Sequence, residues 1–335
     1  MVTGFQSSGF DGAAWLLQPR TAPEWEQTAL EVFRHQAAQV PVYKNYVELL
    51  DVAPESVQTV EEIPFLPITF FKQHRVATGD QAEAVFTSSG TTGALPSSHY
   101  VQDLALYEAS FTACFERQYG PVAEWCFLCL LPAYLERQGS SLVHMADALI
   151  QRSNYDQSGF YLDNLSALLT QVCDNEASGI PTVLLGVSFA LMDFADLAAP
   201  LPLQHTVVME TGGMKGRREE LTKEALHAYL QQRLHIPAIH SEYGMTELLS
   251  QAYSKGNGRF SAPDWMRVYP RELRDPFAPV KVGRSGVLRI LDLANVHSCA
   301  FIETQDLGRC HADGTFEVLG RVDFSDVRGC NLMVD

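Results

Sequence analysis

Hydrophobic residues recur along the chain at two spacings, and these predict both helices and strands. Apolar positions from Trp25 to Ala37 have helical spacing, so we expect a helix over 21–39. Thr21 and Glu24 have capping-box spacing at its start, and Pro41 is expected to end it and begin a loop-rich stretch. Further helices are predicted over 103–117, 142–150, 188–197 and 218–234, and strands over 84–86, 125–131, 182–187, 205–210 and 236–240.

This alternation of strands and helices predicts an α/β domain with a mainly parallel sheet, whose ligands bind at the carboxyl ends of the strands. The last hundred residues differ, because short alternating runs over 283–293, 300–303 and 315–319 predict antiparallel strands. We therefore expect a core domain over 1–320 with a small β-rich subdomain over about 265–320, and a short tail over 321–335.

Composition excludes some classes of partner. The chain has 335 residues and a formal net charge of -16, from 40 acidic side chains against 24 lysines and arginines. Nucleic acids and anionic membranes need broad basic surfaces, so neither is an expected partner. No apolar run approaches the roughly 20 residues that span a bilayer. The first residues lack the pattern of a secretory signal, so a cytoplasmic location is expected.

The cysteines predict neither disulfides nor a metal site. Their number, seven, is odd, and the chain is too long to need a disulfide framework. Cys126 and Cys129 fall in a predicted strand, where residues three apart point to opposite faces and cannot bind one ion. We expect both to be core thiols. Cys299 and Cys310, with the histidines near them, lack the usual spacing of zinc ligands.

A loop rich in hydroxyl groups follows the short strand predicted over 84–86. It consists of Ser88, Ser89, Gly90, Thr91, Thr92 and Gly93. Glycine allows the backbone to turn its N–H groups towards a ligand, and hydroxyl groups add further donors. The loop is therefore either a phosphate-binding segment or a polar surface turn.

Four further polar segments follow in order, over 211–213, 243–247, 304–308 and 320–323, and we expect each to be a loop. Together with 88–93, they resemble the adenylate-forming superfamily of acyl-CoA synthetases, luciferases and peptide-synthetase adenylation domains. The chain is most similar to the LuxE acyl-protein synthetase family, on the segments 97–99, 130–137, 139–142, 210–213 and 328–330.

The resemblance implies a large adenylation-type α/β domain of mixed and parallel sheets flanked by helices, with a small β-rich subdomain. It also implies ATP and Mg²⁺ as ligands and a role for each segment. The loop 88–93 would hold the ATP phosphates, and Gly212, Gly213 and Met214 would line the adenine. Tyr243 and Gly244 would lie beside the nucleotide, Asp306 would accept hydrogen bonds from the ribose, and Arg321 would reach the ribose or phosphates. Thr246 would donate to the α-phosphate, and Glu247 would hold Mg²⁺.

The implied reaction joins a carboxylic acid, fatty or aryl, to AMP and releases pyrophosphate. The acyl group would then pass to a thiol, for which Cys330 near the C-terminus is the candidate. Two alternatives stay open: an acyl- or aryl-CoA ligase that uses CoA or a carrier thiol, and a nucleotide-binding scaffold without catalysis. His99 and His144 could touch the substrate or be structural.

The sequence departs from the superfamily at two points. No lysine follows Gly93, and only twelve residues follow Asp323, so we expect a short tail here in place of the usual lid domain with its catalytic lysine. Lys215, Lys281 or Arg284 could supply the missing charge. A protein partner such as an acyl reductase or an acyl acceptor could also cover the open pocket.

Overall fold

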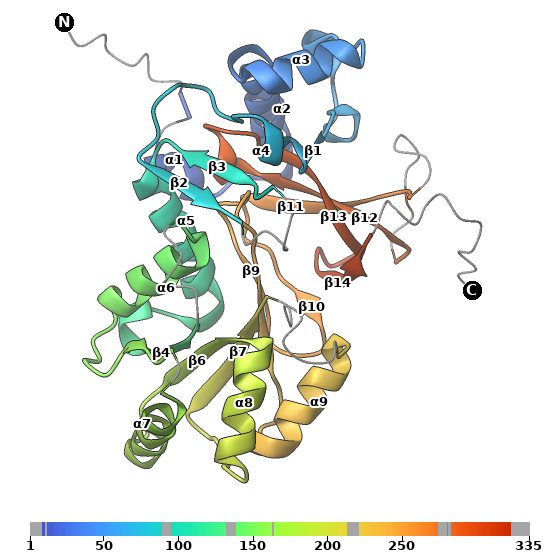
Figure 1. Ribbon diagram of the computed structural model, residues 1–335. Coiled ribbons are helices and arrows are strands. Elements are labelled where there is room, and N and C mark those ends of the chain that lie inside the picture. Colours follow the sequence, from blue (N-terminus) through green and yellow to red (C-terminus); the bar gives the residue numbers. More distant parts are fainter. Residues whose placement is uncertain are drawn as a thin grey trace, which may run out of the picture.

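The computed structural model describes residues 9–10, 12–88, 95–131, 139–162, 164–212, 221–273, 280 and 283–322. Two large sheets organise this part of the chain, and Figure 1 shows them one above the other. The edge strand β9 (Ala252–Ser254) of the lower sheet and the edge strand β10 (Arg259–Phe260) of the upper sheet contact each other where the two sheets adjoin. No helix among the described residues has the length and apolar character needed to cross a membrane.

The lower sheet is parallel apart from one edge strand. Its order is β5 (Gly159–Phe160), β4 (Cys126–Leu130), β6 (Thr182–Val187), β7 (Thr206–Thr211), β8 (His240–Tyr243) and β9 (Ala252–Ser254), and β9 runs antiparallel to β8. Every residue of β4 and β6 is buried, which is typical of strands covered by helices on both faces.

Helices flank this sheet, as Figure 1 shows, and α8 and α9 lie side by side. The helices are α5 (Leu104–Tyr119), α6 (Ser141–Arg152), α7 (Leu165–Ser178), α8 (Ser188–Ala198) and α9 (Lys223–Leu234). Polar residues cap several of them, since the side chains of Asp103 and Thr222 each accept a hydrogen bond from a backbone N–H of the first turn.

The upper sheet is antiparallel, in the order β10 (Arg259–Phe260), β14 (Phe316–Arg321), β13 (Phe301–Cys310), β12 (Ser285–Asp292) and β11 (Met266–Arg271). The short strand β1 (Leu66–Pro67) pairs with β13 in parallel. A separate hairpin joins β2 (Ala84–Thr87) to β3 (Ser98–Val101). The α/β fold class is thus confirmed: helices flank a mostly parallel sheet, and an antiparallel half-barrel adjoins it.

The N-terminal part of the chain forms α1 (Gly12–Leu17), α2 (Ala22–Gln39), α3 (Pro41–Leu49) and α4 (Phe70–Gln73), and short 3₁₀ turns lie at Pro54–Ser56, Val60–Glu62, Val122–Glu124 and Leu293–Asn295. The helix α1 contacts α5 and α4 contacts β3, whereas α2 and α3 pack on the antiparallel sheet. Phe33 of α2 and Tyr43 of α3 both contact Phe301 of β13, with ring centroids 6.0 and 6.1 Å apart. Buried aromatic contacts of this kind hold α2 and α3 on the sheet.

Several sequence predictions need correction. Pro41 begins a second helix instead of a loop, because proline is well tolerated in the first turn. The helix α7 was not predicted. The strand expected over 236–240 lies at His240–Tyr243, and the segment 304–308 is part of the strand β13 rather than a loop. Arg321, also expected in a loop, ends β14.

The prediction of core thiols is confirmed. Cys126 and Cys129 are buried in β4, both are free, and burial raises the pKa of each thiol. Among the described residues, no group of three or more His, Cys, Asp and Glu side chains is placed to hold a metal ion.

Candidate functional site

Three residues expected near a nucleotide meet where the two sheets adjoin. Tyr243 ends β8 of the parallel sheet, and its hydroxyl donates to Asp306 Oδ2 over 2.7 Å. Asp306 lies in β13 of the antiparallel sheet, opposite Arg321 of β14, whose Nε is 3.4 Å from Asp306 Oδ1. Residues more than sixty positions apart therefore form one polar cluster.

Aromatic side chains support this cluster. The ring of Tyr243 packs against Phe316 and Phe260, with centroid distances of 5.5 and 5.8 Å. Burial, and secondarily the carboxylate of Asp306, raises the pKa of Tyr243 well above its ordinary value. The phenol therefore stays protonated and acts as a donor to Asp306.

Glu247 lies close to the start of the hydroxyl-rich loop. Its carboxyl group is buried, which raises its pKa, while a hydrogen bond with the Ser97 side chain opposes that shift. Ser97 and Ser88 are joined twice: Ser88 N–H donates to Ser97 O over 3.0 Å, and Ser97 N–H donates to Ser88 Oγ over 2.8 Å. The first residue of the loop is thus fixed beside Glu247.

His99 holds the backbone that carries Thr246 and Glu247. Its Nδ1 lies 2.9 Å from Thr246 O, and its Nε2 lies 2.9 Å from Ser298 Oγ. Burial lowers the pKa of His99 to about 4, so the ring is neutral near pH 7. Asn295 Nδ2 also donates to Glu247 O over 2.7 Å. His99 is thereby engaged in positioning this segment.

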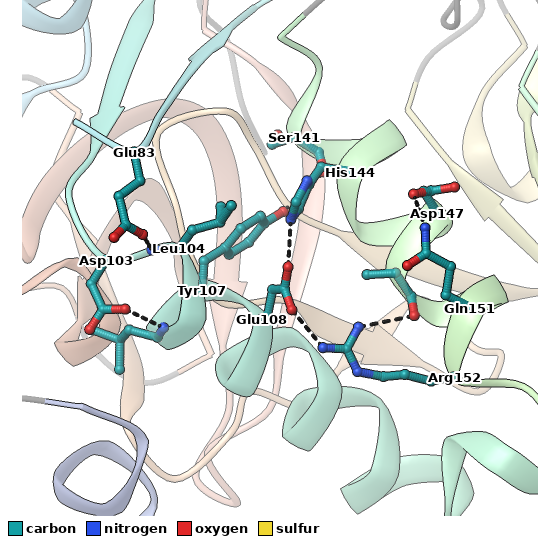
Figure 2. Close-up of polar contacts among 12 residues, drawn as sticks. Glu83, Asp103, Leu104, Tyr107, Glu108, Ser141, His144, Asp147, Gln151 and Arg152 are labelled. Atoms are coloured by element: carbon teal, nitrogen blue, oxygen red, sulfur yellow. Dashed lines mark hydrogen bonds and ion pairs between the residues drawn. The ribbon is translucent and has the colours of Figure 1, made fainter.

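His144 is engaged in a contact between helices. Figure 2 shows its Nε2 directed at Glu108 Oε1, 3.2 Å away, and Glu108 Oε2 accepting from Arg152 over 2.6 Å. The His144 ring stacks on Tyr107, with centroids 5.8 Å apart. These contacts join α5 to α6, which explains His144 without a substrate.

Asp292 anchors the segment after Glu247. Its carboxylate accepts from the N–H groups of Leu249, Ser250 and Ala294 and from the hydroxyl of Ser250, at 2.7 to 3.2 Å. The side chain is 0% exposed, and burial raises its pKa to about 6. This fully satisfied carboxyl group fixes the backbone through which the chain runs from Glu247 to β9.

Glu242 was missed by the sequence predictions. It lies in β8, directly before Tyr243, and is 8% exposed. Thr211 Oγ1 donates to its Oε2, and burial raises the pKa of this carboxyl group to about 7. The available signal was an acidic residue directly before the tyrosine–glycine pair. Because the strand was predicted over 236–240, the prediction did not place Glu242 in it.

The remaining predicted residues have mixed outcomes. Gly212 has a positive φ of 70°, which favours glycine, and its carbonyl oxygen accepts from Ser188 Oγ over 2.9 Å. Gly244 directly follows β8, and Arg284 is exposed just before β12. Ser89 to Gly93, Gly213, Met214, Lys215, Lys281, Asp323 and Cys330 lie outside the described residues.

Solved structures of adenylate-forming ligases share this fold. An open conformation of 2-hydroxyisobutyryl-CoA ligase in complex with 2-HIB-AMP and CoA matches with a TM-score of 0.66 and 13% identity, covering 94% of this chain and 79% of that chain. ATP-bound MatB from Rhodopseudomonas palustris matches with a TM-score of 0.52 and 16% identity, covering 71% of this chain and 48% of that chain. An ATP-bound RpMatB-BxBclM chimera matches with a TM-score of 0.54 and 17% identity, covering 71% of this chain and 47% of that chain.

The chain thus spans about half the length of the MatB structures it matches. Identities this low establish a common fold and leave the substrate open. No protein-family model matches the chain, and no curated protein is significantly similar to it in sequence.

Proposed function

We propose that the protein is an ATP-dependent acyl-activating ligase. In this reaction a carboxylate oxygen of the acid bonds to the α-phosphorus of ATP. The bond from that phosphorus to the oxygen of the β-phosphate breaks, and pyrophosphate leaves. The acyl group of the resulting acyl-AMP then moves to a thiol, and AMP is released.

The observation that carries the proposal is the cluster of Tyr243, Asp306 and Arg321 beside Glu247, within a fold shared with ATP-bound structures. Arg321 and Glu247 influence one another electrostatically, and so do Tyr243 and Glu247. One small region therefore offers a carboxylate acceptor, an aromatic face, a cation and a second carboxyl group.

Each of these groups has a role in binding a nucleotide. Asp306 accepts hydrogen bonds from the ribose hydroxyls, because an ionised carboxylate is a strong acceptor. Tyr243 orients that carboxylate through its own hydrogen bond and presents its ring to the nucleotide. Arg321, whose side chain is 75% exposed, is free to turn towards a ribose or phosphate oxygen.

Glu247 fits a magnesium site, although it is a single carboxyl group. Mg²⁺ usually keeps several waters and takes one or two protein carboxylates together with substrate phosphates. The metal would neutralise charge on the phosphates during transfer. The Ser97 side chain interacts with the Glu247 carboxyl group and lowers its pKa, and Ser97 also pairs with Ser88 at the start of the proposed phosphate loop. Thr246 would donate to the α-phosphate from the adjoining position.

The acid and the acceptor are proposed from the family resemblance. The acid would be fatty or aryl, and the final thiol would be Cys330, as in an acyl-protein synthetase. The neighbour with CoA bound favours the alternative in which CoA takes the acyl group. Exchange of Cys330 for serine separates the two, because self-acylation needs Cys330 whereas transfer to CoA does not.

Exchange of labelled pyrophosphate into ATP, with a panel of carboxylic acids, tests the proposal. We expect exchange that depends on one class of acid and on Mg²⁺. Glu247→Gln should lower the rate about 100-fold, whereas Glu26→Gln, the same change on the exposed face of α2, should leave it unaltered. Binding of ATP without exchange for any acid would establish a non-catalytic scaffold instead.

A further inference from the structure

Glu242 and Gln251 are two buried polar side chains that the proposed nucleotide site does not use. They are 8% and 5% exposed. Glu242 belongs to β8, and Gln251 directly precedes β9, its antiparallel neighbour. Tyr243 pairs with Ala252 in these two strands. Glu242 directly precedes Tyr243, and Gln251 directly precedes Ala252, so both lie next to this pair.

Gly244 brings the two side chains together. A Cβ atom added at Gly244 would lie 2.5 Å from Glu242 Oε1 and 3.5 Å from Gln251 Cγ. Since carbon and oxygen atoms do not approach to 2.5 Å without a bond, only glycine leaves room for the carboxyl group where it stands. Glu242 Oε1 is thus directed across Gly244, on the same side as Gln251.

Each of these side chains has an oxygen without a hydrogen-bond partner in the part of the chain that the structure describes. Thr211 Oγ1 donates to Glu242 Oε2, but Glu242 Oε1 receives no such bond. Gln251 Oε1 is buried and also has none. Buried polar atoms are nearly always paired, so the unpaired Gln251 Oε1 beside the Glu242 carboxyl group indicates a place for a donor from a ligand.

The charges around Glu242 favour such a donor. Glu210 on β7 raises its pKa, and Lys223 of α9 opposes this, but Lys223 Nζ pairs with Glu210 Oε1 over 2.7 Å. His227 Nε2 lies 3.5 Å from the same Glu210 oxygen. Tyr253 of β9 and Tyr107 of α5 also interact with Glu242, and burial raises the pKa of both, so they remain uncharged phenols.

We propose that Glu242 and Gln251 recognise a hydrogen-bond donor, an amino or hydroxyl group, on the carboxylic acid that the protein activates. This inference rests on the proposed function and names the class of acid. Gly244 adjoins Tyr243, which binds Asp306, so the subsite lies next to the proposed nucleotide site. An acid with an unsubstituted hydrocarbon chain would leave Gln251 Oε1 buried and unpaired and would offer no donor to Glu242, so the site discriminates against it.

Pyrophosphate exchange with acids of one carbon skeleton tests this inference. The panel holds the unsubstituted acid with its 2- and 3-hydroxy and 2- and 3-amino derivatives. We expect kcat/KM at least about tenfold higher for a donor-bearing acid than for the unsubstituted one. Glu242→Gln should reduce that ratio by at least about tenfold, most strongly for an amino acid, because the charge of the carboxylate is lost.

Gly244→Ala provides a second variant, because its new Cβ displaces the Glu242 carboxyl group at an unstrained backbone position. It should reduce the same ratio, whereas Glu26→Gln should preserve it. Urea unfolding checks that each variant is folded. If Glu242→Gln does not fold, the ratio measured for Gly244→Ala decides the test.

Three results overturn the inference. If the wild-type protein prefers the unsubstituted acid, the inference about Glu242 and Gln251 is wrong, and the proposed function is unaffected. An equal loss for every acid in Glu242→Gln assigns Glu242 a purely structural role. Binding of ATP without exchange for any acid removes the proposed function itself, and the acid subsite with it.

Discussion

Asp292 and Glu242 are both buried carboxyl groups beside the segment that leads into β9, but their oxygen atoms have very different partners. Asp292 accepts four hydrogen bonds, three of them from backbone N–H groups. Glu242 accepts one, from Thr211, and its Oε1 has no partner among the described residues. Burial raises the pKa of both, to about 6 and about 7.

This difference separates a carboxyl group that holds the fold from one that is open to a ligand. The donors around Asp292 lose their partner if it is removed, so its contribution is to stability. Within the described residues the carboxyl group of Glu242 accepts only from Thr211, so these residues offset little of the free energy that its burial costs. Unpaired polar groups of this kind are typical of functional sites, where stability is exchanged for binding.

The largest effect should come from removing Asp292. Asp292→Ala leaves three buried N–H groups and one hydroxyl without an acceptor, so we expect a loss of about 4 kcal/mol in the free energy of unfolding. Glu242→Ala should show no such loss, because one hydroxyl loses its partner at a cost of about 1 kcal/mol while the removal of a buried, partly ionised carboxyl group offsets that cost. Urea unfolding at pH 7 measures both, and equal losses would contradict the comparison.

The next effect depends on pH. The folded chain raises the pKa of Glu242 above its ordinary value of 4.5 to about 7. The folded state therefore holds this proton more tightly, so stability declines as pH rises from about 4.5 to 7. Glu242→Gln removes this decline and should be more stable than the wild type at pH 8.5, by about 3 kcal/mol, and nearly equal to it at pH 4.

Asp292→Asn is the matched control for that experiment. Its amide nitrogen would face backbone donors in place of an accepting oxygen, so this variant should be destabilised at every pH. Urea unfolding from pH 4 to 8.5 compares the two variants. A gain in stability for Asp292→Asn, or none for Glu242→Gln at high pH, would show that the two carboxyl groups do not differ as described.

A smaller loss of stability is expected when the hydrogen bond to Asp306 is removed. Its Oδ2 accepts from Tyr243, and Arg321 approaches its Oδ1. Tyr243→Phe removes one neutral donor from a partly buried carboxylate, which should cost about 1 kcal/mol of unfolding free energy. If the phenol contributed nothing, thermal unfolding of the variant would coincide with that of the wild type.

The smallest change in stability is expected for Arg321→Ala. The Arg321 side chain is 75% exposed, and exposed ion pairs are screened by solvent, so stability should change by no more than about 0.5 kcal/mol. ATP affinity should nevertheless fall about tenfold, in line with the loss of one charged hydrogen bond. Calorimetric titration with ATP measures this loss, and unchanged affinity would exclude Arg321 from the nucleotide site.

Much of the parallel sheet could be predicted because each strand is recognisable by itself. The residues of β4 and β6 form continuous apolar runs, and the hydrophobic spacing of α2, α5 and α6 marks their buried faces. The strand β8 was misplaced because its residues, His240 to Tyr243, are mostly polar. The strand lies between β7 and β9 in the sheet, and the hydrophobicity of its own residues does not indicate that position.

The sequence by itself determined the periodic elements, the capped helix starts and the order of the polar segments that resemble an adenylate-forming enzyme. Only the tertiary structure decided which of those segments meet. Tyr243 and Asp306 lie in different sheets and touch because the end of β8 adjoins the middle of β13. The two roles of Asp292 and Glu242 likewise depend on which donors the fold brings to each oxygen, and hydrogen-bond partners distant in sequence are set by packing rather than by local pattern.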